Sequence, residues 1–318
     1  MERSHPHYDR LIAAARHAGP ATVAVAHPCD RSALEGALDA ARMGLIKPIL
    51  VGPVERIRQE ADAARLDISA LPIVDTEHSH ASAARAVQLV HEGAATALMK
   101  GSLHTDELMG AVVATATGLR TSRRLSHCFV MDVPERAEPL IITDAAVNIV
   151  PTLADKVDIV QNAIDLAHVL RFNPVKVAIL AAVETVSAKM PSTIDAAALC
   201  KMADRGQITG ALLDGPLAMD NAIDPQAAAI KHLVSPVAGQ ANVLLAPDLE
   251  AGNMLAKSLS FMAGASAAGI VLGARVPVIL TSRADTVQAR LASCAVAVLV
   301  AHSKLSGSRI LGGWPHAG

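Results

Sequence analysis

The sequence predicts an α/β protein built on mainly parallel sheets. Short apolar runs rich in β-branched residues alternate along the chain with helical segments, which is the pattern of this class. Several of the runs are apolar throughout, as in strands that helices cover on both faces. Hydrophobic residues make up 52% of the 318 and aromatic residues only 2%, so small aliphatic side chains must fill the core.

Eight apolar runs are candidate strands, and the segments between them carry helical spacing. Val157, Val160, Ile164 and Ala167 step by three or four residues, which places them on one face of a helix. The polar, proline-marked stretch 132–139, "DVPERAEP", is the expected hinge between two lobes. The candidate strands are 22–26, 48–51, 96–99, 140–143, 175–182, 210–213, 242–246 and 276–280.

Composition and charge argue against several classes of protein. The net charge is −2 with both signs mixed along the chain, so no basic nucleic-acid groove is expected. The N-terminus has no apolar signal region, and the uncharged stretch 258–274 is short and rich in Gly, Ala and Ser. We therefore expect a cytoplasmic protein that does not enter a membrane. The Rossmann and P-loop glycine motifs are absent, which weighs against nucleotide binding as the main function. The cysteines have no metal-ligand spacing and are expected to be buried thiols: Cys29, Cys128, Cys200 and Cys294.

The stretch 276–286, "VPVILTSRADT", places polar side chains directly after an apolar run. In parallel α/β sheets ligands bind beyond the carboxyl ends of the strands. Thr281, Ser282 and Arg283 follow such an end and precede a helix, where hydroxyls, a guanidinium and exposed backbone N–H groups suit an anion such as phosphate. The alternative is that Asp285 caps the helix and Arg283 makes a surface ion pair.

A second polar loop, "KGSLHTDEL", follows the run 96–99. Lys100 and Ser102 are candidates for binding an anion there. Thr105 is explained by capping the next helix, because Thr is a good N-cap and acidic residues suit the first turn.

Three other stretches carry candidate binding residues, and two of them equally allow a structural interpretation. The loop "DAAVNIVPT" carries Asn148, and in "PDLEAGNMLAKSL" Asn253 and Lys257 lie one turn apart on one helix face, which could equally be an ion-paired surface. In "MDNAID", Asp220 and Asp224 have a spacing that could bind a divalent metal. Because a proline follows Asp224, that residue could instead be a helix N-cap.

Taken in order, these motifs resemble the phosphate acetyl/butyryltransferase family. The series is "DAAVNIVP", "VAILAAVETVSAKMPSTIDA", "GALLDGPLAMDNAI", "NVLLAPDLEAGNMLAKSL" and "VPVILTSRADT", and the resemblance covers roughly 96–302. The segments "TSRAD" and "AVETVSAKMPST" are most similar to the phosphate butyryltransferase branch. They are also similar to the transacylase half of proteins that fuse an enoyl-CoA hydratase to this domain, although we expect no hydratase domain here.

The resemblance implies an enzyme that interconverts acyl-CoA plus phosphate with acyl phosphate plus CoA, without a metal or other cofactor. It implies two α/β/α lobes similar to isocitrate and isopropylmalate dehydrogenases, with the active site in the cleft between them, usually in a homodimer. On this pattern 1–138 and 282–318 form a discontinuous first lobe and 139–281 the second. The family's phosphate-binding Ser-Arg pair falls on Ser282 and Arg283, the expected catalytic residues. The candidate substrate-binding donors are Lys100, Ser102, Asn148, Asn253 and Thr281.

The chain departs from the acetyl-specific pattern at two positions. Acetyl-specific members carry an Asp seven residues after the Ser, proposed to deprotonate the CoA thiol, and an Arg in the helix after the "HT" loop. This chain has Ala289 and Met109 there. Two other classes therefore stay open: a catalytically weak or silent protein that binds CoA or acyl-CoA, and a decarboxylating dehydrogenase with a divalent metal on Asp220 and Asp224.

Overall fold

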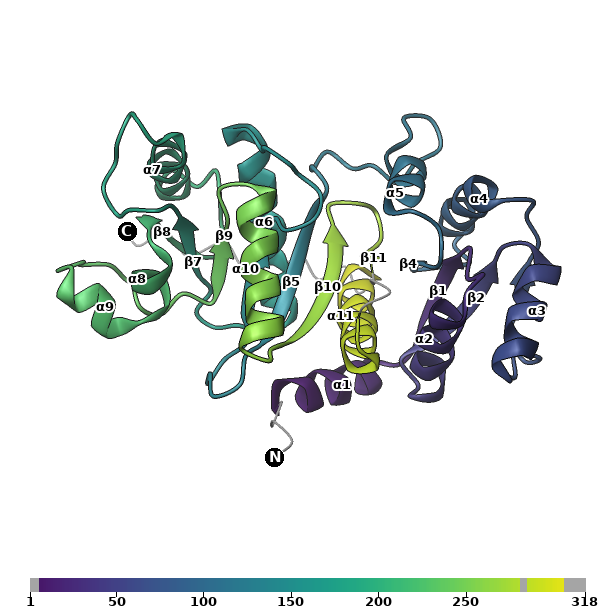
Figure 1. Ribbon diagram of the computed structural model, residues 1–318. Coiled ribbons are helices and arrows are strands. Elements are labelled where there is room, and N and C mark those ends of the chain that lie inside the picture. Colours follow the sequence, from purple (N-terminus) through teal and green to yellow (C-terminus); the bar gives the residue numbers. More distant parts are fainter. Residues whose placement is uncertain (1–5, 281–284, 306–318) are drawn as a thin grey trace. The chain divides into compact units, whose positions relative to one another are not determined.

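The computed structural model describes residues 6–280 and 285–305. By their internal contacts these residues divide into two compact units. The first unit comprises 8–123 and 267–305, and the second unit comprises 124–266 together with residues 6 and 7. Each unit is an α/β structure with a mainly parallel run of strands (Figure 1), which confirms the fold class predicted from the sequence.

The strands of the first unit follow the order β3-β2-β1-β4-β11-β10. All neighbouring pairs are parallel except β10 and β11, which are antiparallel. The strands are β1 (Ala21–Ala26), β2 (Ile46–Val51), β3 (Ile73–Val74), β4 (Ala97–Lys100), β10 (Ser266–Leu272) and β11 (Val278–Ile279). The helices are α1 (Pro6–Ala18), α2 (Arg31–Arg42), α3 (Val54–Ala64), α4 (Ser79–His91), α5 (Thr105–Val113) and α11 (Val287–Leu305).

The core of the first unit forms around β1, a central strand with little contact with water. Val23 through Ala26 are all fully buried, as the uninterrupted apolar run predicts. Helix α4 packs on β1, while α11 packs on α2 and β11. Small residues make up much of the buried part of α11, which lets it approach its neighbours closely. These contacts bring the late part of the chain back onto the early strands.

The strands of the second unit follow the order β5-β6-β9-β7-β8, with β5 and β6 antiparallel and the other pairs parallel. The strands are β5 (Ser126–Asp132), β6 (Leu140–Thr143), β7 (Lys176–Leu180), β8 (Leu212–Leu217) and β9 (Val243–Leu245). The helices are α6 (Leu153–Val169), α7 (Pro191–Asp204), α8 (Met219–Ile223), α9 (Pro225–Ile230) and α10 (Leu249–Met262).

The stretch 132–139, expected to be a hinge, joins β5 to β6. These strands are antiparallel partners, with Met131 opposite Leu140, so the stretch is a connection inside the second unit rather than between the units. The contacts divide the chain at 123/124 and 266/267, earlier than the breaks expected at 138/139 and 281/282.

The uncharged stretch 258–274 contains the end of α10 and most of β10 rather than one continuous helix. Within 6–280 and 285–305, no helix is long and apolar enough to cross a membrane.

Candidate functional site

The carboxyl ends of three strands of the first unit lie along one edge of its sheet. Strands β1, β4 and β11 are neighbours and parallel, with Ala26 opposite Lys100 and Ile279 opposite Met99. The loops after β1 and β4 therefore leave the sheet side by side, at the edge where parallel sheets bind ligands. We call this edge the β1–β4–β11 edge. Thr281, Ser282 and Arg283 follow β11 in the sequence and lie outside the described residues.

Lys100 is the last residue of β4 and is half-buried. Its Nζ donates hydrogen bonds to the carbonyl oxygens of Gly101 and Leu103, each at 3.2 Å. The ammonium group is therefore held over its own loop at the β1–β4–β11 edge. The predicted role of Lys100 in binding an anion stays a prediction.

Ser102 joins the loop after β4 to the loop after β1. Its Oγ donates to the carbonyl oxygen of His27 at 2.8 Å and accepts from the backbone N–H of Cys29 at 3.2 Å. Gly101 makes this approach possible, because a Cβ there would lie 2.6 Å from the His27 carbonyl oxygen. The hydroxyl group of Ser102 therefore holds the two loops together, and its one proton is used in the hydrogen bond to His27.

His27 is a residue of this edge that the sequence interpretation missed. Its backbone has a φ of 55°, in the left-handed region, and its ring is almost fully buried. Strained backbone of this kind clusters at functional sites. A signal was available, because His27 follows an apolar strand run in the same layout as the loops that were singled out.

A hydrogen bond to Ser82 holds the buried ring of His27. The Ser82 hydroxyl donates its one proton to the carbonyl oxygen of His78 at 2.9 Å. His27 Nδ1 lies 3.1 Å from Ser82 Oγ, and the same oxygen lies 2.8 Å from Thr76 Oγ1. Burial, reinforced by the charge of Arg56, lowers the pKa of His27 and keeps the ring neutral at neutral pH.

In the second unit, a buried carboxylate organises the loop after β6. Asp144 is 2% exposed, and its Oδ1 accepts the backbone N–H groups of Ala146 at 2.9 Å and Val147 at 3.0 Å. Its Oδ2 accepts from the side-chain amide of Asn148. These bonds compensate the carboxylate for its loss of water and hold the loop in one shape.

Asn148 links Asp144 to an arginine. Its Nδ2 also donates to the carbonyl oxygen of Leu125 at 2.8 Å, and its Oδ1 accepts from Nε of Arg124. Arg124, which the sequence interpretation missed, pairs through Nη1 with Asp155 at 3.0 Å, while about half of its side-chain surface remains exposed. The amide of Asn148 is thus used within the protein, where it fixes the loop and the guanidinium.

Asn253 steadies the same loop from α10. Its Nδ2 donates to the carbonyl oxygen of Ala145 at 3.0 Å. Gly252 allows the close approach, since a Cβ there would collide with the backbone carbonyl of Asp144. The side chains of Ile149 and Val150, directly after Asn148, are 70% and 81% exposed. The first part of the loop is therefore held by polar contacts, and the apolar side chains that follow are exposed.

The two aspartates considered for a metal have other roles. Asp224 caps α9, where its Oδ1 accepts from the backbone N–H groups of Gln226 at 2.6 Å and Ala227 at 3.2 Å. Asp220 lies 3.5 Å from Nζ of Lys231. Among the described residues, no group of three or more His, Cys, Asp or Glu side chains could hold a metal ion.

The cysteines are free thiols with little tendency to ionise. Burial raises the pKa of Cys29 to about 11 and the pKa of Cys128, Cys200 and Cys294 to about 12. A thiolate is the form that acts as a nucleophile or metal ligand. These pKa values therefore argue against both roles near neutral pH.

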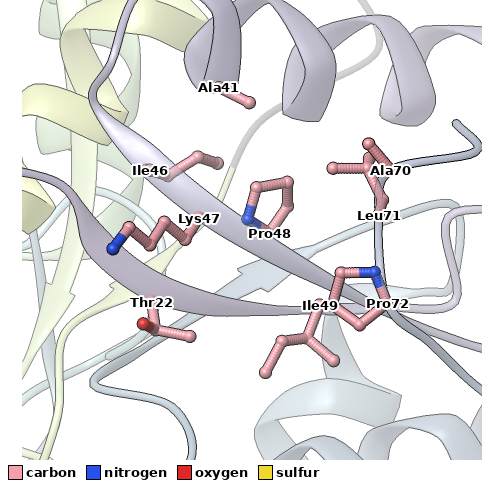
Figure 2. A pocket seen from close by; sticks show the side chains of 9 residues that line it. All are labelled: Thr22, Ala41, Ile46, Lys47, Pro48, Ile49, Ala70, Leu71 and Pro72. Atoms are coloured by element: carbon pink, nitrogen blue, oxygen red, sulfur yellow. The ribbon is translucent and has the colours of Figure 1, made fainter. Parts of the chain in front are cut away.

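A shallow hollow of about 460 Å³ lies at the other end of the first unit's strands (Figure 2). Thr22 and Ile46, at the amino ends of β1 and β2, line it together with Lys47, Pro48 and Pro72. Its walls are mostly aliphatic, and it lies away from the β1–β4–β11 edge. The hollow therefore takes no part in the site described above.

Comparison with known proteins identifies the family. The model of the family described as phosphate acetyl/butaryl transferase matches residues 79–298. A phosphate acetyltransferase of Rhizobium meliloti is 65% identical over 294 residues, which cover 92% of this chain and 93% of that protein. A phosphate butyryltransferase of Clostridium acetobutylicum is 40% identical over 282 residues, 89% of this chain and 94% of that protein.

The fold agrees with this assignment. The crystal structure of a branched-chain phosphotransacylase from Enterococcus faecalis superposes with a TM-score of 0.79 at 30% identity, covering 89% of this chain and 99% of that chain. Both the sequence and the fold are thus shared over nearly the whole length. The chain belongs to the phosphate acetyl/butyryl transferase family.

Proposed function

We propose that this protein is a phosphate acyltransferase, which interconverts acyl-CoA plus phosphate with acyl phosphate plus CoA. The observation that carries the proposal is the 65% identity, over 92% of the chain, to a phosphate acetyltransferase. The motifs from "DAAVNIVP" to "VPVILTSRADT" support it independently, because their order and spacing match the family.

The preferred acyl group in this proposal is acetyl, with butyryl also accepted. The support is the difference between 65% identity to a phosphate acetyltransferase and 40% to a phosphate butyryltransferase. The "TSRAD" segment, which is more typical of the butyryl branch, is the reason for keeping butyryl-CoA as a substrate. One methylene in an apolar pocket changes discrimination by only about 1–3 kcal/mol.

The reaction is an acyl transfer between a thiol and a phosphate oxygen. A free thiol has a pKa of about 8.5, so a few per cent is thiolate at neutral pH. Ser282 and Arg283 hold the phosphoryl group, and Lys100 adds positive charge at the β1–β4–β11 edge. Ser102, Asn148 and Asn253 serve mainly to hold the loops, because their side chains already hydrogen-bond within the protein. Thr281 remains a proposed substrate donor.

A general base is not required for this chemistry, since positioning and electrostatic stabilisation can carry most of the rate. A base typically adds about 10²–10⁴-fold. Ala289 stands where acetyl-specific members carry an acid, so the reaction here proceeds without a base at that position. No metal or cofactor other than the substrates takes part.

In this proposal the protein works as a homodimer in the cytoplasm. Exposed apolar side chains on α10 support a contact with a second copy, because Met254 is 62%, Phe261 81% and Met262 83% exposed. Light scattering after size-exclusion chromatography tests this surface. The native protein should have the mass of two chains and Phe261→Glu that of one, and a single-chain mass for the native protein would contradict the dimer.

A phosphate-dependent CoA-release assay tests the activity. Acetyl-CoA and butyryl-CoA are mixed with the protein, phosphate, a thiol reagent and a metal chelator. Release that requires phosphate and survives the chelator is the expected result, and Arg283→Ala should abolish most of it. The matched control is Arg275→Ala, an exposed arginine at the other end of β11.

A second candidate function is a catalytically silent protein that binds CoA or acyl-CoA. The observation that favours it is the pair of departures at Ala289 and Met109. Folded protein that binds CoA but releases none with either acyl-CoA would establish this function and contradict the transferase.

A further inference from the structure

Arg290, in the first turns of α11, has an incompletely paired guanidinium group. Its Nη1 donates to Ser32 Oγ at 2.9 Å, whereas its Nε is buried and has no hydrogen-bond partner in the structure. Nη2 makes no hydrogen bond with the described residues, and because it is not among their enclosed polar atoms it opens to solvent. No carboxylate of the described residues forms an ion pair with Arg290.

The fold places this guanidinium at the β1–β4–β11 edge. Helix α2, which carries Ser32 in its first turn, begins shortly after β1 ends, and α11 begins shortly after β11. Strands β1 and β11 flank β4, so the hydrogen bond between Arg290 and Ser32 bridges the two helices where these strands end. This is the edge at which Lys100 closes β4, and at which parallel sheets bind ligands.

Gly36 makes room for the stem of this arginine. It lies inside α2, where a Cβ would be 3.2 Å from Cδ and 3.5 Å from Nε of Arg290. Glycine inside a helix destabilises that helix relative to alanine. Helix α2 is thus intrinsically less stable at Gly36, the position against which Arg290 packs.

The position is costly for a residue with a purely structural role. A buried N–H without a partner destabilises the folded state. An exposed arginine on the same helix would avoid that cost. What the arrangement provides is a guanidinium that is held by packing on Gly36 and by Ser32, and whose Nη2 makes no hydrogen bond with the described residues.

We propose that Arg290 binds a phosphate group of the substrates, with Ser32 and Gly36 as positioning residues. The inference rests on the proposed acyl transfer for the identity of the substrates. A fixed guanidinium presents parallel N–H donors to two oxygens of a phosphate, which is the geometry that arginine offers and lysine does not. The phosphate group belongs either to inorganic phosphate and acyl phosphate or to CoA.

The test compares Arg290→Gln, Arg290→Lys and the control Arg275→Gln in binding and in turnover. Calorimetry gives the dissociation constants of CoA and of dephospho-CoA, which lacks the 3′-phosphate, without any need for catalysis. Steady-state kinetics give KM for phosphate and for acetyl-CoA. We expect Arg290→Gln to raise one of these constants at least tenfold with a smaller change in kcat, and Arg275→Gln to change none of them.

The pattern of loss identifies the phosphate group. A raised KM for phosphate with unchanged CoA binding assigns Arg290 to the transferred phosphate. Weaker binding of CoA but not of dephospho-CoA assigns it to the 3′-phosphate, and weaker binding of both assigns it to the diphosphate. Unchanged constants in folded Arg290→Gln would overturn the proposal, and so would full recovery in Arg290→Lys, since lysine cannot present parallel donors.

Gly36→Ala gives an independent test without removing a charge. Alanine favours the helix, but its Cβ crowds the arginine stem, so the fold should persist while the same constant rises as in Arg290→Gln. An unchanged constant would count against the positioning role. If the native protein binds CoA but has no activity, the acyl-transfer proposal fails, whereas the calorimetric comparison still decides the role of Arg290 toward CoA.

Discussion

Lowering the pH from 7 to 5 should destabilise this protein through His127, a buried histidine near the start of β5. Its ring packs edge-on against Phe129 with the ring centres 4.4 Å apart, and its Nδ1 is buried without a hydrogen-bond partner in the structure. Burial lowers the pKa of His127 from 6.5 to about 4, against the opposing charge of Asp144. The folded protein therefore resists protonation at a pH where the unfolded chain takes up a proton.

The sign and size of the effect follow from linkage. Because the unfolded state binds more protons, the free energy of unfolding falls as the pH drops below 6.5 and levels off below about 4. The difference between the pKa of His127 in the unfolded and folded states corresponds to a loss of roughly 3 kcal/mol in the free energy of unfolding across this pH range, at about 1.4 kcal/mol per pKa unit. Between pH 7 and pH 5 the loss from this residue is about 2 kcal/mol.

Urea unfolding followed by circular dichroism at pH 5, 6, 7 and 8 measures this effect. His127→Leu removes the titrating group and should flatten the fall in unfolding free energy between pH 7 and pH 5 by about 2 kcal/mol. His17→Leu is the matched control, because His17 is an exposed histidine on α1 and should leave the native pH dependence unchanged. An equally steep fall in native protein and His127→Leu would refute the reasoning.

Three further changes test the packing at the two loops. Gly101→Ala should lower the free energy of unfolding by about 1–3 kcal/mol, because its Cβ would collide with backbone carbonyls after β1. The matched control is Gly110→Ala in α5, where the added Cβ has open space around it. This change should raise the free energy of unfolding by about 0.5–1 kcal/mol. Equal effects of the two substitutions in urea unfolding would contradict the packing argument. Asn148→Leu should lower the free energy of unfolding by about 2–4 kcal/mol, because it removes hydrogen-bond partners from the buried Asp144 carboxylate and from Arg124 Nε. A decrease below about 1 kcal/mol would show that these groups find other partners.

The strongest predictions of structure from the sequence came from uninterrupted apolar runs. The run 140–143 is β6, and 22–26 differs from β1 by one residue, because a strand buried on both faces has few polar residues to obscure it. Three strands were not predicted, and one of them, β3 (Ile73–Val74), has only two residues. Ser126–Asp132 begins and ends with polar residues, and Ser266–Leu272 begins with small residues that indicated packing rather than a strand.

The sequence indicates a candidate site residue where a polar residue directly follows a strand, as Lys100 does, and its role in binding stays a prediction. Three residues with polar side chains at these edges were missed: His27, Arg124 and Arg290. His27 and Arg124 depend on partners far along the chain, Ser82 for the first and Asn148 for the second. Arg290 lies on a helix and reaches its edge only because α11 packs against α2. No local pattern marks Arg124 or Arg290 as part of a site, whereas His27 directly follows an apolar run and could have been found.

The sequence by itself determined the family, the α/β class and the loops that carry polar groups. Those properties depend on composition and on order along the chain, which is all that apolar runs and motifs record. The tertiary structure decided which of those loops meet and what each side chain does there. Strands β4 and β11 are neighbours although well over 100 residues separate them, and this pairing sets the edge that Lys100 and Arg290 share. Parallel pairing is non-local, so the hydrogen bonds that turn Ser102 and Asn148 into supports for their loops exist only once the sheets have formed.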